Sequence, residues 1–454
     1  MGRSKRRKTE NGGGSYSTDA KSPEQLATED ACARRFDAYY RAQLPALDDA
    51  EWARVSAAFK EPLPATFRVT GSAALATRIE RELAEIAARC DAAAAAMREA
   101  GPTAEDVARH SRDADPERAA AAWHRKASSA LNLRPVAWVP GRRAWRLDAE
   151  RAALRKSPAH KELHTYLVAH EAAGTITRQE AVSMVPPLFL KAGPGDRVLD
   201  CCAAPGSKTS QLLEAVCPPG RDARAALTDG GVVVANDENL SRAHTLVHQT
   251  KRFGAPAWAV THCDATLFPS IRGAAQGAPR IPFDKVLCDV PCSSDGTLRK
   301  APAVLRRWTC RQGLVLHSLQ SRIALRSAQL LKPGGTLVYS TCSLNPIEDE
   351  AVVAEALRKD PSLEVVADAD ACPGLRRRPG LQSWKVFEDA GAGLRERSSP
   401  DEKGGKIRAS CFPPAEERIR EQLPRCMRFL PHDDDTGGFF VAVLRKGGAS
   451  EAAA

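Results

Sequence analysis

The run Asp284-Lys-Val-Leu-Cys-Asp-Val-Pro-Cys-Ser-Ser-Asp-Gly-Thr297 contains a short apolar segment and ends in a polar turn that carries a cysteine. A second run, Gly335-Thr-Leu-Val-Tyr-Ser-Thr-Cys-Ser-Leu-Asn-Pro346, has the same pattern. Each is typical of a short strand followed by a turn. Adjacent parallel strands lie about 5 Å apart, so Cys292 and Cys342 would leave one edge of a sheet and share a cleft. Because ligands bind at that edge in α/β sheets, we expect the functional site there.

The chain on both sides of these runs alternates apolar segments with amphipathic ones. We expect strands at 197–200, 232–235, 258–260, 286–288 and 336–339, and helices at 207–216 and 240–253. This alternation predicts an α/β fold with a parallel, doubly wound sheet. Near the end, 426–430 and 439–444 flank a polar turn, which predicts a hairpin of antiparallel strands at one side of the sheet. We expect loop insertions at 221–231, 273–282 and 390–410.

Composition and periodicity divide the chain into four parts. The first part is polar and rich in Gly and Ser, as disordered segments are. In the second part, Phe36, Tyr39, Tyr40 and Leu44 recur at helical spacing and are expected to line one buried face. We expect a disordered basic tail at 1–30 and a mostly helical accessory module at 31–148. We expect a catalytic domain at 149–447 and a second disordered tail at 448–454. The accessory module either helps to hold a polymeric substrate or simply packs against the domain.

The charge balance points to an anionic partner. The chain of 454 residues has 66 Lys and Arg against 56 Asp and Glu, a formal net charge of +10. Nucleic acid is the partner that this excess favours first, and plain solubility is the less favoured explanation. A basic cluster near the start is typical of nuclear import signals and nucleic-acid contacts, and also occurs in tails without a role; it comprises Arg3, Lys5, Arg6, Arg7 and Lys8. We expect a nuclear location, the nucleolus included.

Cysteine usage argues against a disulfide or zinc protein. There are 13 cysteines, an odd number, and none has the C-x-x-C spacing. No secretory leader precedes them, and no apolar run is long enough to span a bilayer. We therefore expect reduced thiols in a cytosolic or nuclear compartment, with neither a metal nor a membrane as partner. The sequence leaves the oligomeric state open.

A candidate nucleoside site lies in the run Asp200-Cys-Cys-Ala-Ala-Pro-Gly-Ser-Lys-Thr209, between a predicted strand and a predicted helix. Ala and Gly let the backbone approach a ligand, and the helix start offers free N–H groups. The run matches neither G-x-G-x-x-G nor G-x-x-x-x-G-K-[ST], which disfavours a dinucleotide or triphosphate. Asp237, Asp264 and Asp289 each follow a predicted strand. One such carboxylate is more often a helix cap or turn former, but three at one sheet edge favour contacts to ribose and adenine.

Separate motifs carry a resemblance to a known family. The chain resembles the Nop/Sun family of RNA cytosine-5 methyltransferases. The motifs that carry this resemblance are Cys202-Ala-Ala-Pro-Gly-Ser-Lys208, Asp289-Val-Pro-Cys292 and Ser340-Thr-Cys-Ser-Leu-Asn-Pro346. The further runs 177–184 and 430–443 look like its eukaryotic multisite tRNA branch, and the resemblance covers about Leu63 to Lys446. The predicted sheet, parallel with an antiparallel end, is also the architecture of methyltransferases that use a nucleoside cofactor.

The resemblance implies a class I (Rossmann-like) methyltransferase fold that uses S-adenosyl-L-methionine, and a substrate that is RNA, with tRNA first. It also implies that Cys342 is the nucleophile and that Cys292 assists product release. The positions that match the family's cofactor site are Cys202, Ala203, Ala204, Pro205, Gly206, Ser207, Lys208, Asp237, Asp264 and Asp289.

The chemistry of cytosine explains why two thiols are needed. C5 is too poor a nucleophile to accept a methyl group directly, but a thiolate added at C6 turns the ring into an enamine. Charge then builds toward N3, where Asp289 is our candidate to donate or share a proton. Cys292 is our candidate base for the C5 proton, and Lys208 our candidate for lowering the pKa of both thiols. A single cysteine after a strand is more often a buried core thiol, but two at adjacent strand ends favour catalysis.

Two features depart from the family pattern. Ser294 stands where the family usually has Gly, and its side chain is expected to tighten the loop. The chain stops at Ala454, whereas members of the multisite tRNA branch generally continue with an RNA-binding region, so we expect the accessory module and the basic surface to hold the RNA. The alternatives are a ribosomal RNA cytosine-5 methyltransferase, an inactive RNA-binding scaffold and, less favoured because it lacks the Thr-Cys partner, a DNA cytosine-5 methyltransferase.

Overall fold

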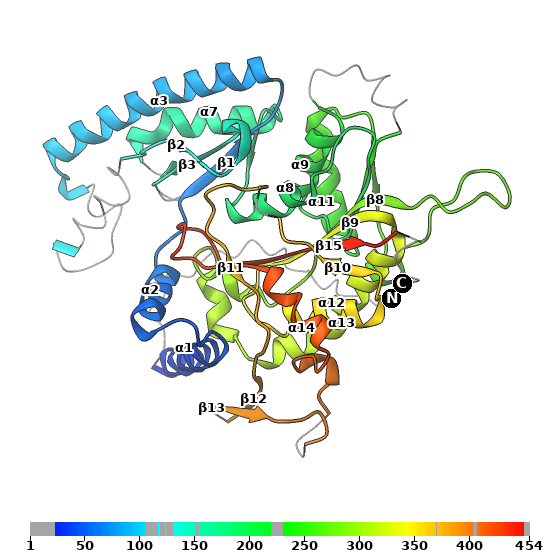
Figure 1. Cartoon of the computed structure of the whole chain (residues 1–454). Helices are drawn as coiled ribbons and strands as arrows, with labels where there is room; N and C mark the ends of the chain where they lie inside the picture. Colours follow the sequence, from blue (N-terminus) through cyan, green and yellow to red (C-terminus); the bar gives the residue numbers. More distant parts are fainter. Residues whose placement is uncertain are drawn as a thin grey trace, which may run out of the picture.

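A nine-stranded sheet forms the centre of the molecule in the computed structural model (Figure 1). The structure describes residues 23–105, 117–118, 123, 130–149, 154–155, 157–218, 230–368, 370–391, 393–402 and 406–448. The strands in spatial order are β11 (Arg378–Pro379), β14 (Met427–Phe429), β15 (Phe439–Lys446), β9 (Leu331–Thr341), β8 (Phe283–Asp289), β5 (Arg197–Asp200), β6 (Val232–Asn236) and β7 (Trp258–Thr261), with β10 (Leu363–Val365) paired to β15.

The direction of the strands confirms the predicted doubly wound sheet. From β9 to β7 every pairing is parallel, whereas β15 pairs antiparallel with both β9 and β14. The hairpin predicted at 426–444 is therefore present, and β15 is the strand that joins it to the parallel part. This arrangement is the class I methyltransferase fold that the resemblance implied.

Helices cover both faces of the sheet, so its central strands carry apolar residues on both faces. Alternate residues of β15 show this: one set packs beneath α8 (Val185–Leu190) and α9 (Ser207–Val216), and comprises Phe439, Val441 and Val443. The other set packs beneath α12 (Arg311–Leu330) and α13 (Glu350–Lys359), and comprises Phe440, Ala442 and Leu444. The helix α11 (Leu240–Thr250) packs beside α9 and β7. None of the helices in the described ranges is long and apolar enough to cross a membrane.

The N-terminal module differs from the mostly helical segment at 31–148 that the sequence predicted. It contains a four-stranded antiparallel sheet in the order β2 (Arg134–Pro135), β3 (Ala144–Leu147), β1 (Ala65–Val69) and β4 (Ile176–Arg178). Leu83 of α3 (Ala73–Ala100) and Leu163 of α7 (Lys161–Ala172) are buried in its core. The module thus extends to Arg178 instead of ending at 148, because β4 completes the free side of β1 and α7 covers the sheet.

The first two helices belong with the catalytic domain and not with this module (Figure 1). Phe36, Tyr39 and Tyr40 of α1 (Pro23–Gln43) are buried as predicted, but their cluster includes Trp308 and Leu344 of the catalytic domain. The cluster also contains Trp52 of α2 (Asp49–Lys60).

The ends of the chain and its insertions complete the comparison with the sequence. The tail expected to be disordered at 1–30 is helical from Pro23, because a proline is well tolerated at the first position of a helix. Part of the expected loop at 390–410 is instead a hairpin, in which β12 (Val386–Ala390) pairs with β13 (Gly393–Arg397). Val386 and Phe387 of β12 are buried and hold the hairpin against the domain. The expected tail at 448–454 beyond its first residue, the basic cluster at 3–8 and most of the expected loop at 221–231 lie outside the described residues.

A buried ion pair ties the C-terminal hairpin to the rest of the domain. The guanidinium of Arg428, which is 1% exposed, donates from Nε to Glu350 Oε1 at 2.6 Å. Its Nη1 donates to the carbonyl oxygen of Leu344 at 2.8 Å, and its Nη2 lies 3.6 Å from Asp349 Oδ2. One side chain therefore connects β14, the start of α13 and the turn that follows β9.

Replacing this arginine should destabilise the fold strongly. Arg428→Met leaves the carboxylates of Glu350 and Asp349 buried without their cation, so we expect the free energy of unfolding to fall by about 3–5 kcal/mol. Urea unfolding followed by far-UV circular dichroism measures the change. Arg78→Ala, which breaks the exposed Arg78–Glu82 pair on α3, is the control and should have little effect. An equally small effect of Arg428→Met would contradict the assignment.

Candidate active site

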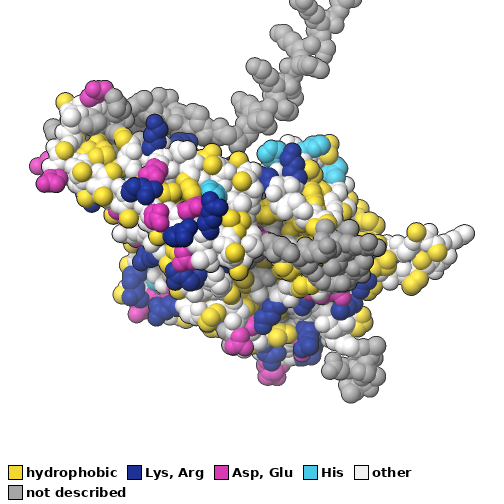
Figure 2. All heavy atoms as spheres, turned by 90° about the horizontal axis from the view of Figure 1, so that it is seen from above, with side chains coloured by type: hydrophobic (Ala, Val, Ile, Leu, Met, Phe, Trp, Pro, Cys, Tyr) yellow, Lys and Arg dark blue, Asp and Glu magenta, His cyan; other side chains and the backbone are white. Residues whose placement is uncertain are grey.

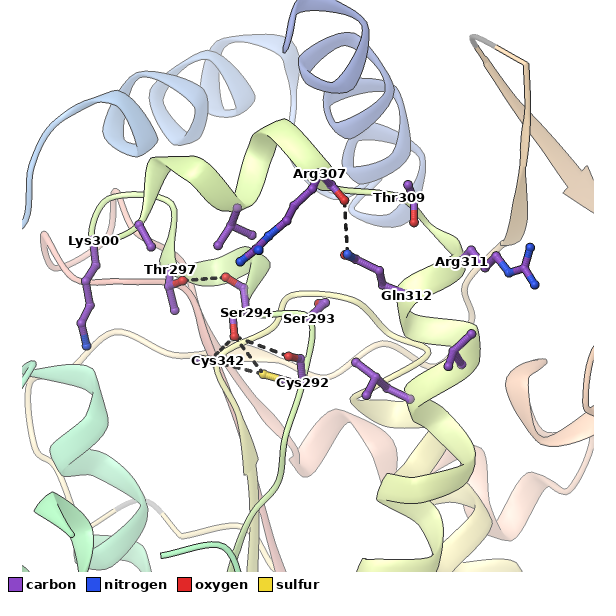
Figure 3. A pocket seen from close by; sticks show the side chains of 14 residues that line it. Cys292, Ser293, Ser294, Thr297, Lys300, Arg307, Thr309, Arg311, Gln312 and Cys342 are labelled. Atoms are coloured by element: carbon purple, nitrogen blue, oxygen red, sulfur yellow. Dashed lines mark hydrogen bonds between the residues drawn. The ribbon is translucent and has the colours of Figure 1, made fainter. Parts of the chain in front are cut away.

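The two predicted thiols meet at the carboxyl edge of the sheet. The register of β8 and β9 pairs Asp289 with Ser340, so the turns that carry Cys292 and Cys342 start side by side. Their Sγ atoms are 3.3 Å apart, and both cysteines are half-buried (Figure 3). The shared cleft expected from the sequence is therefore confirmed.

Both thiols open into a cavity of about 840 Å³. Its charged lining residues, among those that the structure describes, are all cations: Lys300, Arg307 and Arg311. Figure 3 shows the Arg307 side chain directed toward Ser294, above the cysteines. A cavity of this charge favours an anionic ligand over a neutral or cationic one.

Glycine is required where the two turns come closest together. The N–H of Gly296 donates to the carbonyl oxygen of Cys342 at 3.0 Å, and its own carbonyl oxygen accepts from Gly438 at 2.8 Å. A Cβ added at Gly296 would lie 2.4 Å from the Gly438 oxygen and 2.9 Å from the Cys342 oxygen. Ser294 precedes it with φ of +61°, a left-handed conformation that favours glycine. The expectation of a tight loop at Ser294 agrees with this geometry.

A buried carboxylate that the sequence analysis missed lies behind both thiols. Glu348 Oε2 accepts from the N–H of Ser293 at 2.8 Å and from Gln320 Nε2 at 3.0 Å. Its Oε1 accepts from Ser343 Oγ at 3.1 Å, and so Glu348 bonds the residue that follows each cysteine. Burial raises the pKa of Glu348 to about 7. In the sequence it stands in an acidic run before α13, a pattern that normally indicates only a helix start.

The thiol of Cys292 is not in the state that was expected. Its hydrogen bond with Cys342, followed by burial, raises the pKa of Cys292 well above the ordinary value of a thiol. The prediction that Lys208 lowers the pKa of both thiols is thus wrong for Cys292. The physical reasons are the neighbouring sulfur and burial, and the ammonium of Lys208 lies beside a carboxylate, with its Nζ 2.6 Å from Asp289 Oδ2.

Asp289 lies between the thiols and the predicted cofactor edge. Besides Lys208, it accepts a hydrogen bond from Ser340 Oγ at 2.7 Å through Oδ1. Its position allows both roles predicted for it, contact with the cofactor and proton sharing with N3 of cytosine, since a carboxylate oxygen accepts more than one hydrogen bond. Lys208 also lies 5.6 Å from the ring centre of Phe439, which fixes the far end of its side chain.

The predicted cofactor residues form one continuous turn between β5 and α9. The N–H of Ala203 donates to the carbonyl oxygen of Asn236 at 2.7 Å, and that of Ala204 donates to Asp237 Oδ2 at 3.2 Å. Gly206 has φ of +110°, and a Cβ there would lie 2.9 Å from Leu246 Cδ1. Cys202 and Pro205 lie in the same turn, and Ser207 and Lys208 are the first two residues of α9.

The carboxylates predicted for this edge lie in a row across the neighbouring strands. Asp264 follows β7, Asp237 follows β6, and Asp289 ends β8. Asp237 also accepts from the N–H of Asn239 at 3.0 Å, and Asp264 Oδ1 accepts from Thr266 at 2.8 Å, so each also stabilises its own turn. Asp200, which the sequence analysis did not single out, completes the row at the end of β5; burial raises its pKa to about 7.

A cluster of possible metal ligands lies outside this row. Glu51, His432 and Asp433 converge, but a cation is already present among them, because Arg378 Nε lies 2.8 Å from Asp433 Oδ2. Arg378 Nη2 also lies 2.5 Å from Glu51 Oε1. We therefore assign this cluster to the docking of α2.

Glu348 should make stability depend on pH in a defined direction. Its pKa is about 7 in the folded chain and 4.5 ordinarily, so between these values the folded state holds a proton that the unfolded state has lost. The stability of the wild type relative to Glu348→Gln should therefore fall by about 3 kcal/mol as the pH rises through this range. Urea unfolding of both proteins at several pH values measures the difference. The contribution of Asp200 cancels in this difference, because both proteins contain it. A difference that does not change with pH would refute the expectation.

Comparison with known proteins gives the family. Residues 187–445 match the family model described as 16S rRNA methyltransferase RsmB/F. The chain is 39% identical to the tRNA (cytosine(34)-C(5))-methyltransferase of Drosophila melanogaster, over 97% of this chain and 56% of that protein. It is 44% identical to the multisite-specific tRNA:(cytosine-C(5))-methyltransferase trm4b of Schizosaccharomyces pombe, over 68% of this chain and 48% of that protein. The chain thus spans about half the length of these relatives.

A solved structure supports the fold. The crystal structure of NSun6 from Pyrococcus horikoshii with SFG superposes with a TM-score of 0.54 at 17% identity, over 91% of this chain and 98% of that one. Together with the match over 187–445, the thiol pair and the row of carboxylates agree with the resemblance found in the sequence. The chain belongs to the RsmB/F (NOL1/NOP2/Sun) methyltransferase family.

Proposed function

We propose that the chain is an RNA cytosine-C5 methyltransferase that uses S-adenosyl-L-methionine and acts on tRNA. The observation that carries the proposal is the pair of sulfur atoms 3.3 Å apart, open to a cavity lined by cations. The printed names of the relatives from Drosophila melanogaster and Schizosaccharomyces pombe support tRNA as the substrate. The description of the family model keeps ribosomal RNA as the second candidate.

The turn at Cys202–Lys208 with the carboxylates of Asp237 and Asp264 is the region that we assign to the cofactor. The turn fits a nucleoside, because Gly206 brings the backbone close to its neighbours and α9 starts there with free N–H groups. The ligand SFG of the solved relative is an analogue of S-adenosylmethionine. When bound, S-adenosyl-L-methionine supplies an electrophilic methyl group. Asp237 and Asp264 keep lone pairs that can accept from ribose hydroxyls and the adenine amino group.

The target base must enter the cavity unpaired or extruded, since its C6 is otherwise stacked. Cys342 adds to C6 as a thiolate, and the ring electrons move toward C5 and N3. Asp289 is held by Lys208 and Ser340, which keeps a carboxyl group beside the thiols to share a proton with N3. The same ion pair keeps the charge of Lys208 close to the developing anion.

The contact between the thiols sets the order of the proton transfers. While Cys342 is free, its hydrogen bond raises the pKa of Cys292 and keeps the proton on that sulfur. Once Cys342 is bonded to C6, this influence is lost and Cys292 can release its proton to solvent in the cavity. After C5 has received the methyl group, the resulting thiolate takes the C5 proton, the C5–H electrons form the C5=C6 bond, and Cys342 leaves as a thiolate. Cys292 is therefore a base only after the adduct has formed.

The roles of the two cysteines can be tested by trapping. Incubated with S-adenosyl-L-methionine and tRNA that contains 5-fluorocytidine, the protein should form a denaturation-resistant complex that Cys342→Ala abolishes. Cys292→Ala should accumulate the complex on ordinary tRNA, because elimination stalls without a base. Denaturing gel electrophoresis measures both complexes.

The same experiment separates the candidate functions. Ribosomal RNA in place of tRNA tests the second candidate, and an adduct on ribosomal RNA alone would favour it. An adduct that survives Cys342→Ala and depends on Cys292 would reverse the roles, and no adduct on either RNA would indicate a scaffold.

The cations of the cavity should contribute phosphate contacts. On the face of the molecule seen from above, basic and acidic side chains are interleaved (Figure 2), whereas those lining the cavity are cations. Arg307→Gln should weaken tRNA binding and reduce the slope of log K against log [salt] by about 0.7, the value for one contact to a single strand. Filter binding at several salt concentrations measures the slope. Arg358→Gln, which removes a cation of α13 that is paired with Glu416 in the catalytic domain, is the matched control, and equal slopes for Arg307→Gln and the wild type would exclude the contact.

A further inference from the structure

Two neighbouring tyrosines of α1 reach the turns that carry the two thiols. The hydroxyl of Tyr40 donates to Asp295 Oδ2, in the turn after Cys292. The hydroxyl of Tyr39 donates to Asn345 Oδ1 at 2.7 Å, in the turn after Cys342. One helix thus makes a direct hydrogen bond to each turn, although it lies hundreds of residues earlier in the chain.

Each acceptor passes the contact on to the backbone of the turns. Asp295 Oδ1 accepts from the N–H of Leu344 at 2.8 Å, which joins the Cys292 turn to the Cys342 turn. Asn345 Oδ1 accepts from the N–H of Ile347 at 3.0 Å, which closes the Cys342 turn on itself. The Tyr40 hydroxyl therefore holds a carboxylate that spans both turns, and the Tyr39 hydroxyl holds the amide that shapes one of them.

The burial of these hydroxyls indicates that they do more than pack. Tyr39 is 1% exposed and Tyr40 is 0% exposed, in a cluster of rings that includes Trp308 and Phe36. An aromatic ring needed only for packing carries no hydroxyl that must be bonded, and a buried hydroxyl without a partner costs about 1–3 kcal/mol. Burial and the charge of Asp295 raise the pKa of Tyr40 well above its ordinary value, so the hydroxyl remains a donor.

The docking of α1 does not depend on the two hydroxyls. Gln43 donates from Nε2 to the carbonyl oxygen of Lys385 at 2.7 Å, and Gln43 Oε1 accepts from the N–H of Lys385 at 3.0 Å. Trp52 of α2 donates from Nε1 to Asp37 Oδ1 at 2.5 Å, and Glu51 of α2 pairs with Arg378. The hydroxyls can therefore be removed while the helix stays in place.

We propose that Tyr39 and Tyr40 are positioning residues of the active site, through which α1 sets the relative position of Cys292 and Cys342. The inference rests on the proposed function, and it extends the active site to a helix outside the residues 187–445 that match the family model. The thiols act on the same base, and a misplacement of about 1 Å can lower the rate of an enzyme about 100-fold.

The test removes the hydroxyls and keeps the rings. In the double variant Tyr39→Phe/Tyr40→Phe, the rate of methyl transfer to tRNA in a single turnover should fall at least tenfold, while the Kd for tRNA stays within about twofold of the wild type. Tyr166→Phe is the matched control, because that hydroxyl donates to Glu82 at 2.8 Å in the N-terminal module. The control should keep the wild-type rate.

A second measurement does not depend on activity. Phenylarsine oxide bridges two thiols that lie close together, with loss of water, so the wild type should bind it through Cys292 and Cys342, and Cys342→Ser should remove that binding. The double tyrosine variant should bind it at least tenfold more weakly. A wild type that transfers no methyl group would refute the proposed function, whereas the arsenical would still report on the position of the thiols.

Three results of the double variant decide whether the tyrosines are positioning residues. Wild-type rate and wild-type arsenical binding in the double variant would overturn the inference. Hydrogen exchange of the α1 amides is the check on docking, and faster exchange in the double variant would overturn it too, since the loss would then be one of folding. Unchanged exchange together with a slower rate and weaker arsenical binding would establish the positioning role.

Discussion

The whole site depends on the parallel register of β8 and β9. That register starts the two cysteine turns side by side, and the 3.3 Å contact between the sulfur atoms follows only if the turns stay together beyond the strands. Backbone bonds at Gly296 and the carboxylate of Glu348 hold them there. The contact is thus set by groups that do not react, which is how a rigid sheet positions a reactive pair on flexible turns.

Several acids at this edge of the sheet are buried, and their burial has an energetic consequence. Glu348 and Asp200 are held with the pKa of each raised to about 7, so the edge of the sheet favours protonated carboxyls near neutral pH. Arg428 and Lys208 supply the cations that stabilise the carboxylates of Glu350 and Asp289. Because Glu348 and Arg428 each bond more than one segment of the chain, they favour one arrangement of the turns over others.

Local patterns in the sequence were sufficient for the parallel sheet, the hairpin and the row of strand-end residues. The period of the apolar residues specifies which segments are strands, and strand ends of a parallel sheet meet at one edge whatever the connections. Contacts between distant segments could not be predicted in this way. The pairing of β4 with β1, the docking of α1 on the catalytic domain and the partners of Glu348 all join residues whose local patterns indicate only a strand, an amphipathic helix and a helix start.

The pKa of Cys292 shows why the chemistry also needed the structure. A lysine near a thiol suggests a lowered pKa, but the ammonium of Lys208 is paired with Asp289, and the nearest sulfur has the opposite effect on Cys292. The hydrogen bond with Cys342 and burial thus keep the proton on Cys292. In the reaction that we propose, Cys342 serves as the nucleophile while Cys292 keeps its proton. The bond from Cys342 to C6 then removes the hydrogen bond that holds this proton, and that change allows the two thiols to act in sequence.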